Sequence, residues 1–129
     1  WFLPYRYVNI LMMILVGKII SGAGRGRGLG FPTLNLNISD LDIKHGVYAV
    51  KADGNLAVMN WGPQPTFDSD KPVIEVHLLD FEGDFEGAEL QVEILEFIRE
   101  VRHFENAEAL HEQIAKDIVS ARHAYERLS

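Results

Sequence analysis

The chain contains no cysteine. This absence excludes disulfide bridges, thiolate metal sites and a cysteine nucleophile. Zinc chemistry has no other support, because the five histidines show no recognisable ligand spacing. A Gly-x-Ser-x-Gly nucleophile elbow is also missing, so nothing points to a serine hydrolase. A core of apolar side chains must therefore hold the fold without covalent help.

Positive charge is scarce as well, since 12 Lys and Arg face 19 Asp and Glu and give a formal net charge of -7. Such a protein repels polyanions, so we expect no nucleic-acid partner and only a local phosphate site. The apolar run over residues 10–16 is far shorter than the roughly 20 residues that a membrane span needs, and no small-residue cleavage site follows it. We therefore expect a cytoplasmic protein without membrane contact, with a buried first strand in place of an anchor.

The length of the chain fits one domain with one packed core, because 47% of its 129 residues are hydrophobic. We assign residues 12–129 to this domain and residues 1–11 to an N-terminal extension of unknown role. No internal repeat, linker or low-complexity tract divides the chain.

Between residues 15 and 99 the apolar residues come in short bursts separated by Gly, Pro, Asp and Asn, which is the pattern of strands and turns. The predicted strands are Leu15–Ser21, Val47–Ala52, Leu56–Trp61, Val73–Leu79 and Leu90–Ile98. Asp53, Gly54 and Asn55 are predicted to form a tight hairpin turn. No segment between the strands is long enough for a crossover helix, so we expect antiparallel pairing.

The pattern changes after Asn106, which we expect to cap a helix, with Glu108 at the positive end of its dipole. Apolar residues then recur at helical spacing, at Leu110, Ile114, Ile118, Ala121, Tyr125 and Leu128. Charged residues occupy the positions between them, so the helix is amphipathic. Strands followed by one helix predict a mainly β protein, a closed or nearly closed barrel with the helix packed outside.

A run of glycines follows the first predicted strand: Gly22, Gly24, Gly26, Gly28 and Gly30, with Arg25 and Arg27 between them. Glycines allow the backbone to approach a ligand closely and to offer its N–H groups to phosphate oxygens. The run lacks the ending of a P-loop and the spacing of a dinucleotide-binding loop, and no helix follows it. A flexible surface loop without a ligand is the alternative interpretation.

The residues after the glycines carry a second signal. Pro32 fixes its own φ and pushes the preceding residue towards an extended conformation, so we expect residues 32–36 to be extended. Thr33 and Asn35 then point to the same side. A hydroxyl and an amide oxygen side by side are ligands that Mg²⁺ accepts when ATP phosphates complete its shell. The alternative is an ordinary polar strand edge.

A third signal lies in the strand predicted over Val73–Leu79. Alternation places Glu75 and His77 on one face and the apolar residues on the other. This pattern is compatible with a functional role for Glu75 but does not itself indicate one. Alternation alone nevertheless favours a solvated face on a half-buried strand.

The stretch GRGRGLGFPTLN resembles the glycine-rich loop and the Pro-Thr-Ala-Asn signature of riboflavin kinases. Later blocks resemble that family in order and approximate spacing: residues 46–50, 60–62, 65–67 and 75–81, then Gly83-Asp84, Ile98-Arg99, Phe104 and the closing helix. Agreement of several blocks is far more specific than any single motif. The resemblance covers the chain from Val16 to its C-terminus.

The resemblance implies a closed, Greek-key-like antiparallel β-barrel that transfers the γ-phosphate of MgATP to the 5'-hydroxyl of riboflavin, giving FMN and ADP. It implies that Thr33 and Asn35 bind Mg²⁺ and that Glu75 is the catalytic base. ATP and its phosphates would be bound by Gly22, Gly24, Arg25, Gly26, Arg27, Gly28, Gly30, Pro32 and Thr33. The flavin would be bound by Asp84, Arg99 and Phe104, with Phe81 and Phe85 as further aromatic candidates.

Three positions depart from the family pattern: Leu34 stands in place of Ala, Glu86 in place of Tyr, and Val101 in place of Glu. They leave open a non-catalytic flavin- or nucleotide-binding module on the same barrel. A nucleic-acid-binding barrel that uses residues 25–28 is a weaker alternative, given the net charge. The chain is too short to hold an adenylyltransferase as well, so the resemblance implies a separate or fused FMN adenylyltransferase as a partner.

Overall fold

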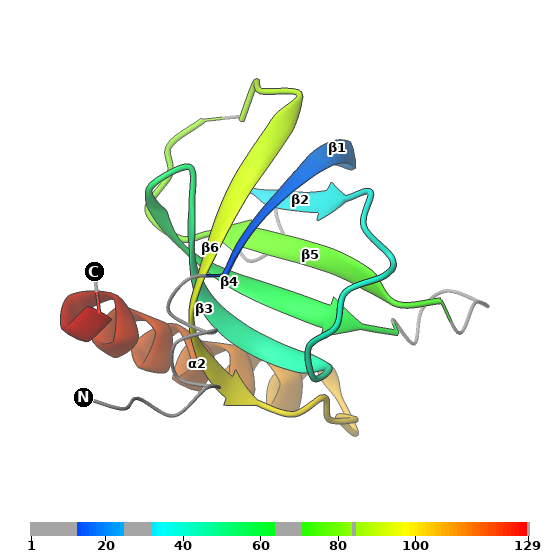
Figure 1. Cartoon of the computed structure of the whole chain (residues 1–129). Helices are drawn as coiled ribbons and strands as arrows, with labels where there is room; N and C mark the ends of the chain where they lie inside the picture. The colour runs from blue at the N-terminus through cyan, green and yellow to red at the C-terminus, as the bar shows by residue number, and fades with distance from the viewer. Residues whose placement is uncertain (1–12, 25–31, 64–70, 84, 129) are drawn as a thin grey trace, which may run out of the picture.

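Each apolar burst of the sequence forms a strand in the computed structural model, which describes residues 13–24, 32–63, 71–83 and 85–128. The elements of this part are β1 (Ile14–Gly24), β2 (Thr33–Leu36), β3 (Gly46–Ala52), β4 (Asn55–Gly62), β5 (Val73–Leu78), β6 (Glu89–Arg99) and α2 (Ala107–Leu128). The strands close into an antiparallel barrel in the order β1-β2-β5-β4-β3-β6. Figure 1 shows this barrel with α2 lying across its outside.

The predicted fold class is confirmed, and most strand ends agree with the sequence prediction to within one residue. The exception is β1, which runs on to Gly24 rather than ending at Ser21. The hairpin between β3 and β4 turns at Asp53 and Gly54, whose φ angles of 48° and 85° are both positive. Positive φ at both central residues is the type I′ geometry that matches strand twist, and it suits an Asp-Gly pair.

The topology is a Greek key, because β3, β4 and β5 are sequential neighbours and β6 returns to pair with β3. Register shifts interrupt the pairing of β1 with β2 and of β3 with β6. Such irregularities increase local twist and bend a strand, which closure of a small barrel requires.

Alternating residues of all six described strands fill the barrel interior. Leu34, Val50, Met59, Val76 and Val92 are among the fully buried side chains there. Burying one such side chain stabilises the fold by about 1.5–3 kcal/mol, so the interior supplies the main driving force for closure.

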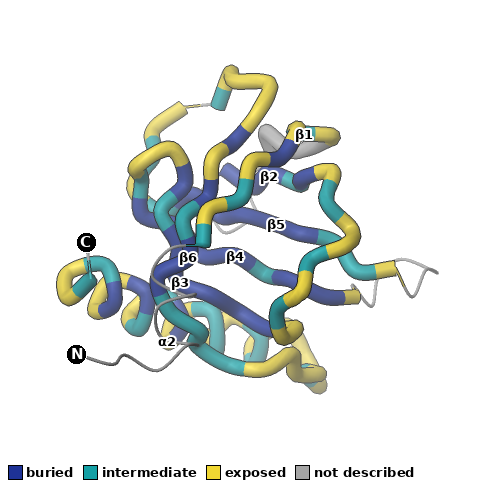
Figure 2. The backbone as a smooth tube through the Cα atoms, in the orientation of Figure 1, coloured by how far each residue is buried: buried dark blue, intermediate teal, exposed yellow. Residues whose placement is uncertain are grey.

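The expectation of a buried first strand is wrong for one of its faces. Leu15 and Ile19 pack against the core, whereas Ile14, Val16 and Ile20 are 52%, 58% and 61% exposed. Figure 2 shows this mixed burial along β1. An uninterrupted apolar run does not reveal that one side of a strand faces solvent.

The helix covers the outer face of β3, β4 and β6. The side-chain oxygen of Asn106 accepts a hydrogen bond from the Ala109 N–H at 2.8 Å, so the predicted N-cap is confirmed. Ala121 and Ala124 are fully buried, which allows the helix to lie close to the strands. No helix among the described residues is long and apolar enough to cross a membrane.

Candidate functional site

Three neighbouring strands present polar side chains at matching register positions. Thr33 and Asn35 of β2 lie opposite His77 and Glu75 of β5, and Asn60 of β4 lies opposite Glu75 on its other side. Directly paired residues of an antiparallel pair point to the same face. These five residues, here called the polar row, therefore share the outer face of the barrel, while the residues between them fill its core.

The polar row is not a solvated face. Thr33, Glu75 and His77 are only 8%, 6% and 7% exposed, so the interpretation that alternation alone favoured is wrong. A buried carboxylate and imidazole are costly unless they are hydrogen-bonded. The structure meets this demand, because no buried side-chain nitrogen or oxygen among the described residues lacks a partner.

His77 lies at the centre of the hydrogen bonds within the polar row. Its Nδ1 is 3.0 Å from the hydroxyl oxygen of Thr33, and its Nε2 is 3.3 Å from a carboxylate oxygen of Glu75. The amide nitrogen of Asn60 is 3.4 Å from the same Nε2. One imidazole ring thus connects side chains from all three strands.

The donor set of the polar row fits a magnesium ion. Thr33, Asn35 and Glu75 offer hydroxyl, amide and carboxylate oxygens at adjacent register positions. Mg²⁺ prefers oxygen ligands and takes only one or two from a protein when nucleotide phosphates supply others. The described residues include no group of three His, Cys, Asp or Glu that could hold a metal without such help. The site therefore suits a cation that arrives with a phosphate ligand.

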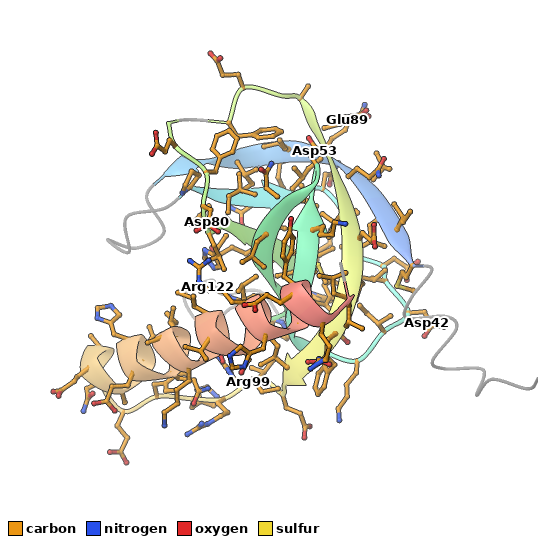
Figure 3. The ribbon with its side chains drawn as sticks, turned by 90° about the vertical axis from the view of Figure 1, so that its left-hand side faces the viewer. Asp42, Asp53, Asp80, Glu89, Arg99 and Arg122 are labelled. Atoms are coloured by element: carbon orange, nitrogen blue, oxygen red, sulfur yellow. The ribbon has the colours of Figure 1, made fainter. Side chains whose placement is uncertain are left out.

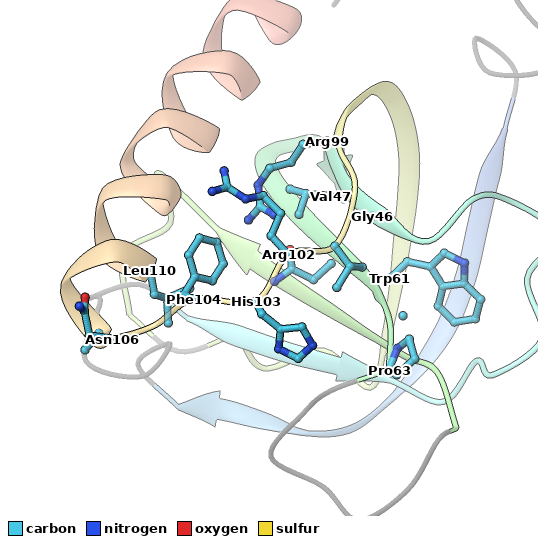
Figure 4. Close-up of a pocket in the computed structure, with 14 residues that line it drawn as sticks. Gly46, Val47, Trp61, Pro63, Arg99, Arg102, His103, Phe104, Asn106 and Leu110 are labelled. Carbon is cyan, nitrogen blue, oxygen red and sulfur yellow. The ribbon is translucent and has the colours of Figure 1, made fainter.

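A pocket of about 340 Å³ adjoins the polar row, between the barrel and the start of α2. Figure 4 shows its lining, which combines strand residues with the segment that leads into the helix. The lining residues that matter most here are Gly46, Asn60, Trp61, Arg99, Phe104 and Leu110. A side chain at Gly46 would lie 2.4 Å from the backbone oxygen of Arg99, so only glycine fits this wall.

Asn60 belongs to both the polar row and the pocket. The register continues from Asn60 to Val47 of β3, and from Val47 to Arg99 of β6. A single line of paired residues thus runs from the candidate metal ligands, past Glu75, into the pocket. Of the residues that line the pocket, Asn60 pairs directly with Glu75.

An ion pair anchors the far wall of the pocket. The guanidinium of Arg99 donates hydrogen bonds of 2.8–3.1 Å to both carboxylate oxygens of Asp117 on α2. Gln113 donates a further hydrogen bond of 3.0 Å to that carboxylate, which is 3% exposed. Arg99 and Arg102 also lie 5.7 and 5.3 Å from the ring centre of Phe104. The pocket wall and the helix are thus held together by charge.

A second ion pair joins the barrel to the helix at its surface. Both terminal guanidinium nitrogens of Arg122 donate to the carboxylate of Asp80, at 2.9 and 3.0 Å, and Figure 3 shows the two side chains facing each other. The hydrogen bond from Arg122 lowers the pKa of Asp80, and the same bond raises the pKa of Arg122. Both groups are largely exposed, so this pair contributes little to stability.

The structure brings together part of the site that the sequence predicts. Thr33, Asn35 and Glu75 are neighbours on one face, and Pro32 is buried beside them. Gly22 and Gly24 end β1 opposite the start of β2. Arg25, Gly26, Arg27, Gly28, Gly30 and Asp84 lie outside the described residues.

The flavin candidates divide into two groups. Arg99 and Phe104 line the pocket, together with Val101, one of the departures from the family pattern. Phe81 and Phe85 instead pack against the barrel interior and against each other, with ring centres 5.9 Å apart. Of these aromatic candidates, only Phe104 is a pocket residue.

Sequence reasoning missed Asn60, His77 and Asp117 as parts of the site. His77 carried a signal, because it shares the alternating face of Glu75. Asn60 gave no signal beyond its place in a block that resembles the family. Asp117 gave no signal, because an acidic residue on an amphipathic helix is ordinary. Their roles come from strand register and helix docking, which a linear pattern does not encode.

A closed antiparallel barrel with a polar row and an adjoining pocket on its outer face, beside one C-terminal helix, defines a class of small-molecule-binding barrels. A family model described as "Flavokinase: Riboflavin kinase" matches residues 11–125 of the chain. The chain therefore belongs to the riboflavin kinase family.

Curated relatives agree with this assignment. The chain is 39% identical over 112 residues to the RNA-binding riboflavin kinase RibR of Bacillus subtilis (strain 168), covering 83% of this chain and 49% of that protein. It is 40% identical over 110 residues to the bifunctional riboflavin kinase/FMN adenylyltransferase of the same organism, covering 78% of this chain and 35% of that protein. The chain thus spans between 35% and 49% of the length of these two relatives.

A solved structure shares the fold. The crystal structure described as a macrolide-efflux protein from Streptococcus pneumoniae superposes with a TM-score of 0.69 at 30% identity, covering 84% of this chain and 38% of that chain. Efflux is a description of that protein alone. The similarity shows that this fold also occurs in that protein.

Proposed function

We propose that this chain is a riboflavin kinase, which transfers the γ-phosphate of MgATP to the 5'-hydroxyl of riboflavin and yields FMN and ADP. The observation that carries the proposal is the line of paired residues that places Glu75 between the oxygen ligands of β2 and the pocket edge at Asn60. Phosphoryl transfer depends chiefly on positioning and charge neutralisation, and this arrangement supplies positions for both substrates.

Thr33 and Asn35 are the proposed holders of Mg²⁺, because their side-chain oxygens are adjacent on the outer face of β2. When bound, the ion neutralises charge on the ATP phosphates that it contacts. The glycine-rich stretch over residues 22–30 is proposed to bind those phosphates through its backbone N–H groups. Pro32, buried at the end of that stretch, fixes the start of β2.

Glu75 is the proposed catalytic base. Its carboxylate accepts the proton of the riboflavin 5'-hydroxyl while that oxygen forms its bond to the γ-phosphorus. The bond from the γ-phosphorus to the bridging oxygen breaks at the same centre, and ADP leaves. Burial of Glu75 keeps bulk water away from the transferring group.

The pocket is the proposed flavin site. Its volume of about 340 Å³ lies within the range of small-molecule pockets. Phe104 and Leu110 give it the apolar and aromatic lining that a flat ring system requires. Arg99, held by Asp117, fixes the wall on which Phe104 rests.

The proposal includes partners and location. An FMN adenylyltransferase, fused or separate, is the proposed consumer of FMN, since a relative is named as bifunctional for both activities. Nucleic acid is proposed not to be a partner, because the net charge of -7 repels polyanions, although one relative is named RNA-binding. We place the chain in the cytoplasm. A low-salt mobility-shift titration with RNA checks the proposal that nucleic acid is not a partner. RNA binding that weakens with added salt would contradict that proposal.

The test is direct. Purified protein is incubated with riboflavin, ATP and Mg²⁺, and FMN is followed by chromatography for wild type, Glu75→Gln and the exposed control Glu89→Gln. We expect FMN from wild type and control, and its near-complete loss from Glu75→Gln, because an amide cannot accept the proton. If riboflavin binds but no FMN forms with any nucleotide or metal, the kinase proposal fails and a flavin-binding module replaces it.

A further inference from the structure

We infer that His77 is a positioning residue that holds the metal-binding hydroxyl of Thr33 and the base Glu75 in one fixed geometry. The inference rests on the proposed function. The ring is rigid and 7% exposed, and its two nitrogens lie 3.0 Å from the Thr33 hydroxyl oxygen and 3.3 Å from a Glu75 carboxylate oxygen.

The placement of His77 follows from the barrel topology. It lies opposite Thr33 across the β2–β5 pair and two residues after Glu75 on the same face of β5. The contact with Thr33 therefore crosses between strands, whereas the contact with Glu75 runs along one strand. Together they fix the distance between an oxygen that would face the cation and an oxygen that would face the hydroxyl.

In a neutral ring, the contacts with Thr33 and Glu75 fit one tautomer. A carboxylate only accepts hydrogen bonds, so the Glu75 contact places the ring proton on Nε2 and leaves Nδ1 to accept the Thr33 O–H. The amide nitrogen of Asn60, 3.4 Å from the same Nε2, cannot donate to a protonated Nε2, so in this tautomer the Asn60 contact is not a hydrogen bond. The Thr33 oxygen then keeps its lone pairs for a cation.

Two substitutions separate the two contacts. An asparagine amide reaches the position of Nδ1 and a glutamine amide reaches that of Nε2, so His77→Asn keeps the partner of Thr33 and His77→Gln keeps the partner of Glu75. Val76→Ala is the matched control, since Val76 is buried on the same strand but faces the core. It reports what loss of packing alone does.

The experiment measures kcat, the Mg²⁺ concentration at half-maximal rate and the melting temperature for each variant. Loss of a residue that orients a ligand typically costs about 10–100-fold in metal affinity or activity. We expect His77→Gln to raise the Mg²⁺ requirement about tenfold or more with kcat within about threefold. We expect His77→Asn to lower kcat about tenfold or more with the Mg²⁺ requirement within about threefold.

Equal effects of the two variants on both parameters, or effects that match Val76→Ala, would overturn the inference. If wild type makes no FMN, the proposed function fails by itself, and the metal contact is then read from MgADP binding by calorimetry. Weaker binding in His77→Gln than in His77→Asn upholds that contact, and equal binding overturns it. Should the variants not fold, ¹⁵N NMR of histidine-labelled wild type decides, because an Nδ1–H tautomer at His77 contradicts the inference.

Discussion

Two halves of the same outer barrel surface are built on opposite principles. Beneath α2 the outer face of β3, β4 and β6 carries an apolar cluster, with Ala49, Val58 and Leu95 packed beside Ala121 and Ala124. Over β2, β5 and the end of β4 the outward residues are the polar row, in which Thr33, Glu75 and His77 are buried and Asn35 and Asn60 are half-buried. Contacts of His77 join the three strands. Figure 1 shows α2 on one side of the barrel only.

The comparison teaches that burial has two separate uses in this barrel. The helix-covered half stabilises the fold by burying apolar area, and this contribution does not depend on the exact orientation of the side chains. In the polar half, burial of polar groups costs stability but fixes their orientation, because each group must find a partner with defined geometry. Substitutions should therefore separate the two halves. Those in the polar half should lower activity more than stability, and those in the helix-covered half should lower stability more than activity.

Glu75→Gln is predicted to give the largest contrast. Loss of a general base lowers kcat by about 10²–10⁴-fold, whereas the amide keeps the size of the carboxylate and most of its hydrogen bonds. We expect a melting temperature close to that of wild type, measured by calorimetry beside kcat. A variant that melts much earlier and turns over normally when folded would place Glu75 in the stability half instead.

Asp117→Ala is predicted to destabilise the helix-covered half most. It leaves the guanidinium of Arg99, whose side chain is 17% exposed, without its carboxylate partner. Breaking such a pair from one side costs about 3–5 kcal/mol, measurable by urea unfolding. The exposed Glu112→Ala on the same helix is the control.

The double variant Arg99→Met with Asp117→Leu should regain stability relative to Asp117→Ala but bind riboflavin more weakly than wild type. A double variant as unstable as Asp117→Ala would contradict the argument that the unpaired guanidinium causes the loss.

Ala124→Leu is predicted to have an intermediate effect. Ala124 is fully buried between the helix and the strands, so added methyl groups push α2 outward. Overpacking of this kind costs about 1–3 kcal/mol in urea unfolding. The neighbouring exposed position provides the control His123→Leu, which should change stability far less. Comparable losses in both variants would mean that the helix is not closely packed at Ala124.

Arg122→Gln is predicted to have the smallest effect. The Arg122 hydrogen bond lowers the pKa of Asp80, so the pair stabilises the fold above the usual Asp pKa and loses this contribution as pH falls through the lowered value. Because the pair is exposed, we expect less than about 1 kcal/mol at neutral pH. Urea unfolding at neutral pH and at pH 3 should differ less for the variant than for wild type. An unchanged difference would show that Asp80 gains nothing from Arg122.

Much of the fold was predictable, because strands, hairpin and helix leave local signals. The hairpin turn was predicted at Asp53, Gly54 and Asn55, and it forms at Asp53 and Gly54, while Asn55 begins β4. The predicted cap at Asn106 is confirmed. Alternation also predicted that Glu75 and His77 share a face. It could not predict that this face is buried, because burial depends on what the closed barrel and its connections place over it.

The candidate site was predictable only in part, for the same reason. The resemblance named Thr33, Asn35 and Glu75, and the strand register makes them neighbours. The register also brings Asn60 to Glu75, a pairing of residues distant in sequence that no local pattern carries. The pocket likewise depends on where α2 docks against the end of β6.

The line of paired residues across the barrel has a geometric consequence of its own. Adjacent strands are about 4.8 Å apart, so the backbone positions of Asn35, Glu75 and Asn60 span about 10 Å. A slip of one residue between β4 and β5 would set Met59 or Trp61 opposite Glu75 and turn every outward side chain of β4 inward. Strand register thus fixes the spacing of the site residues, so an inserted residue within a strand would damage the site more than most single substitutions.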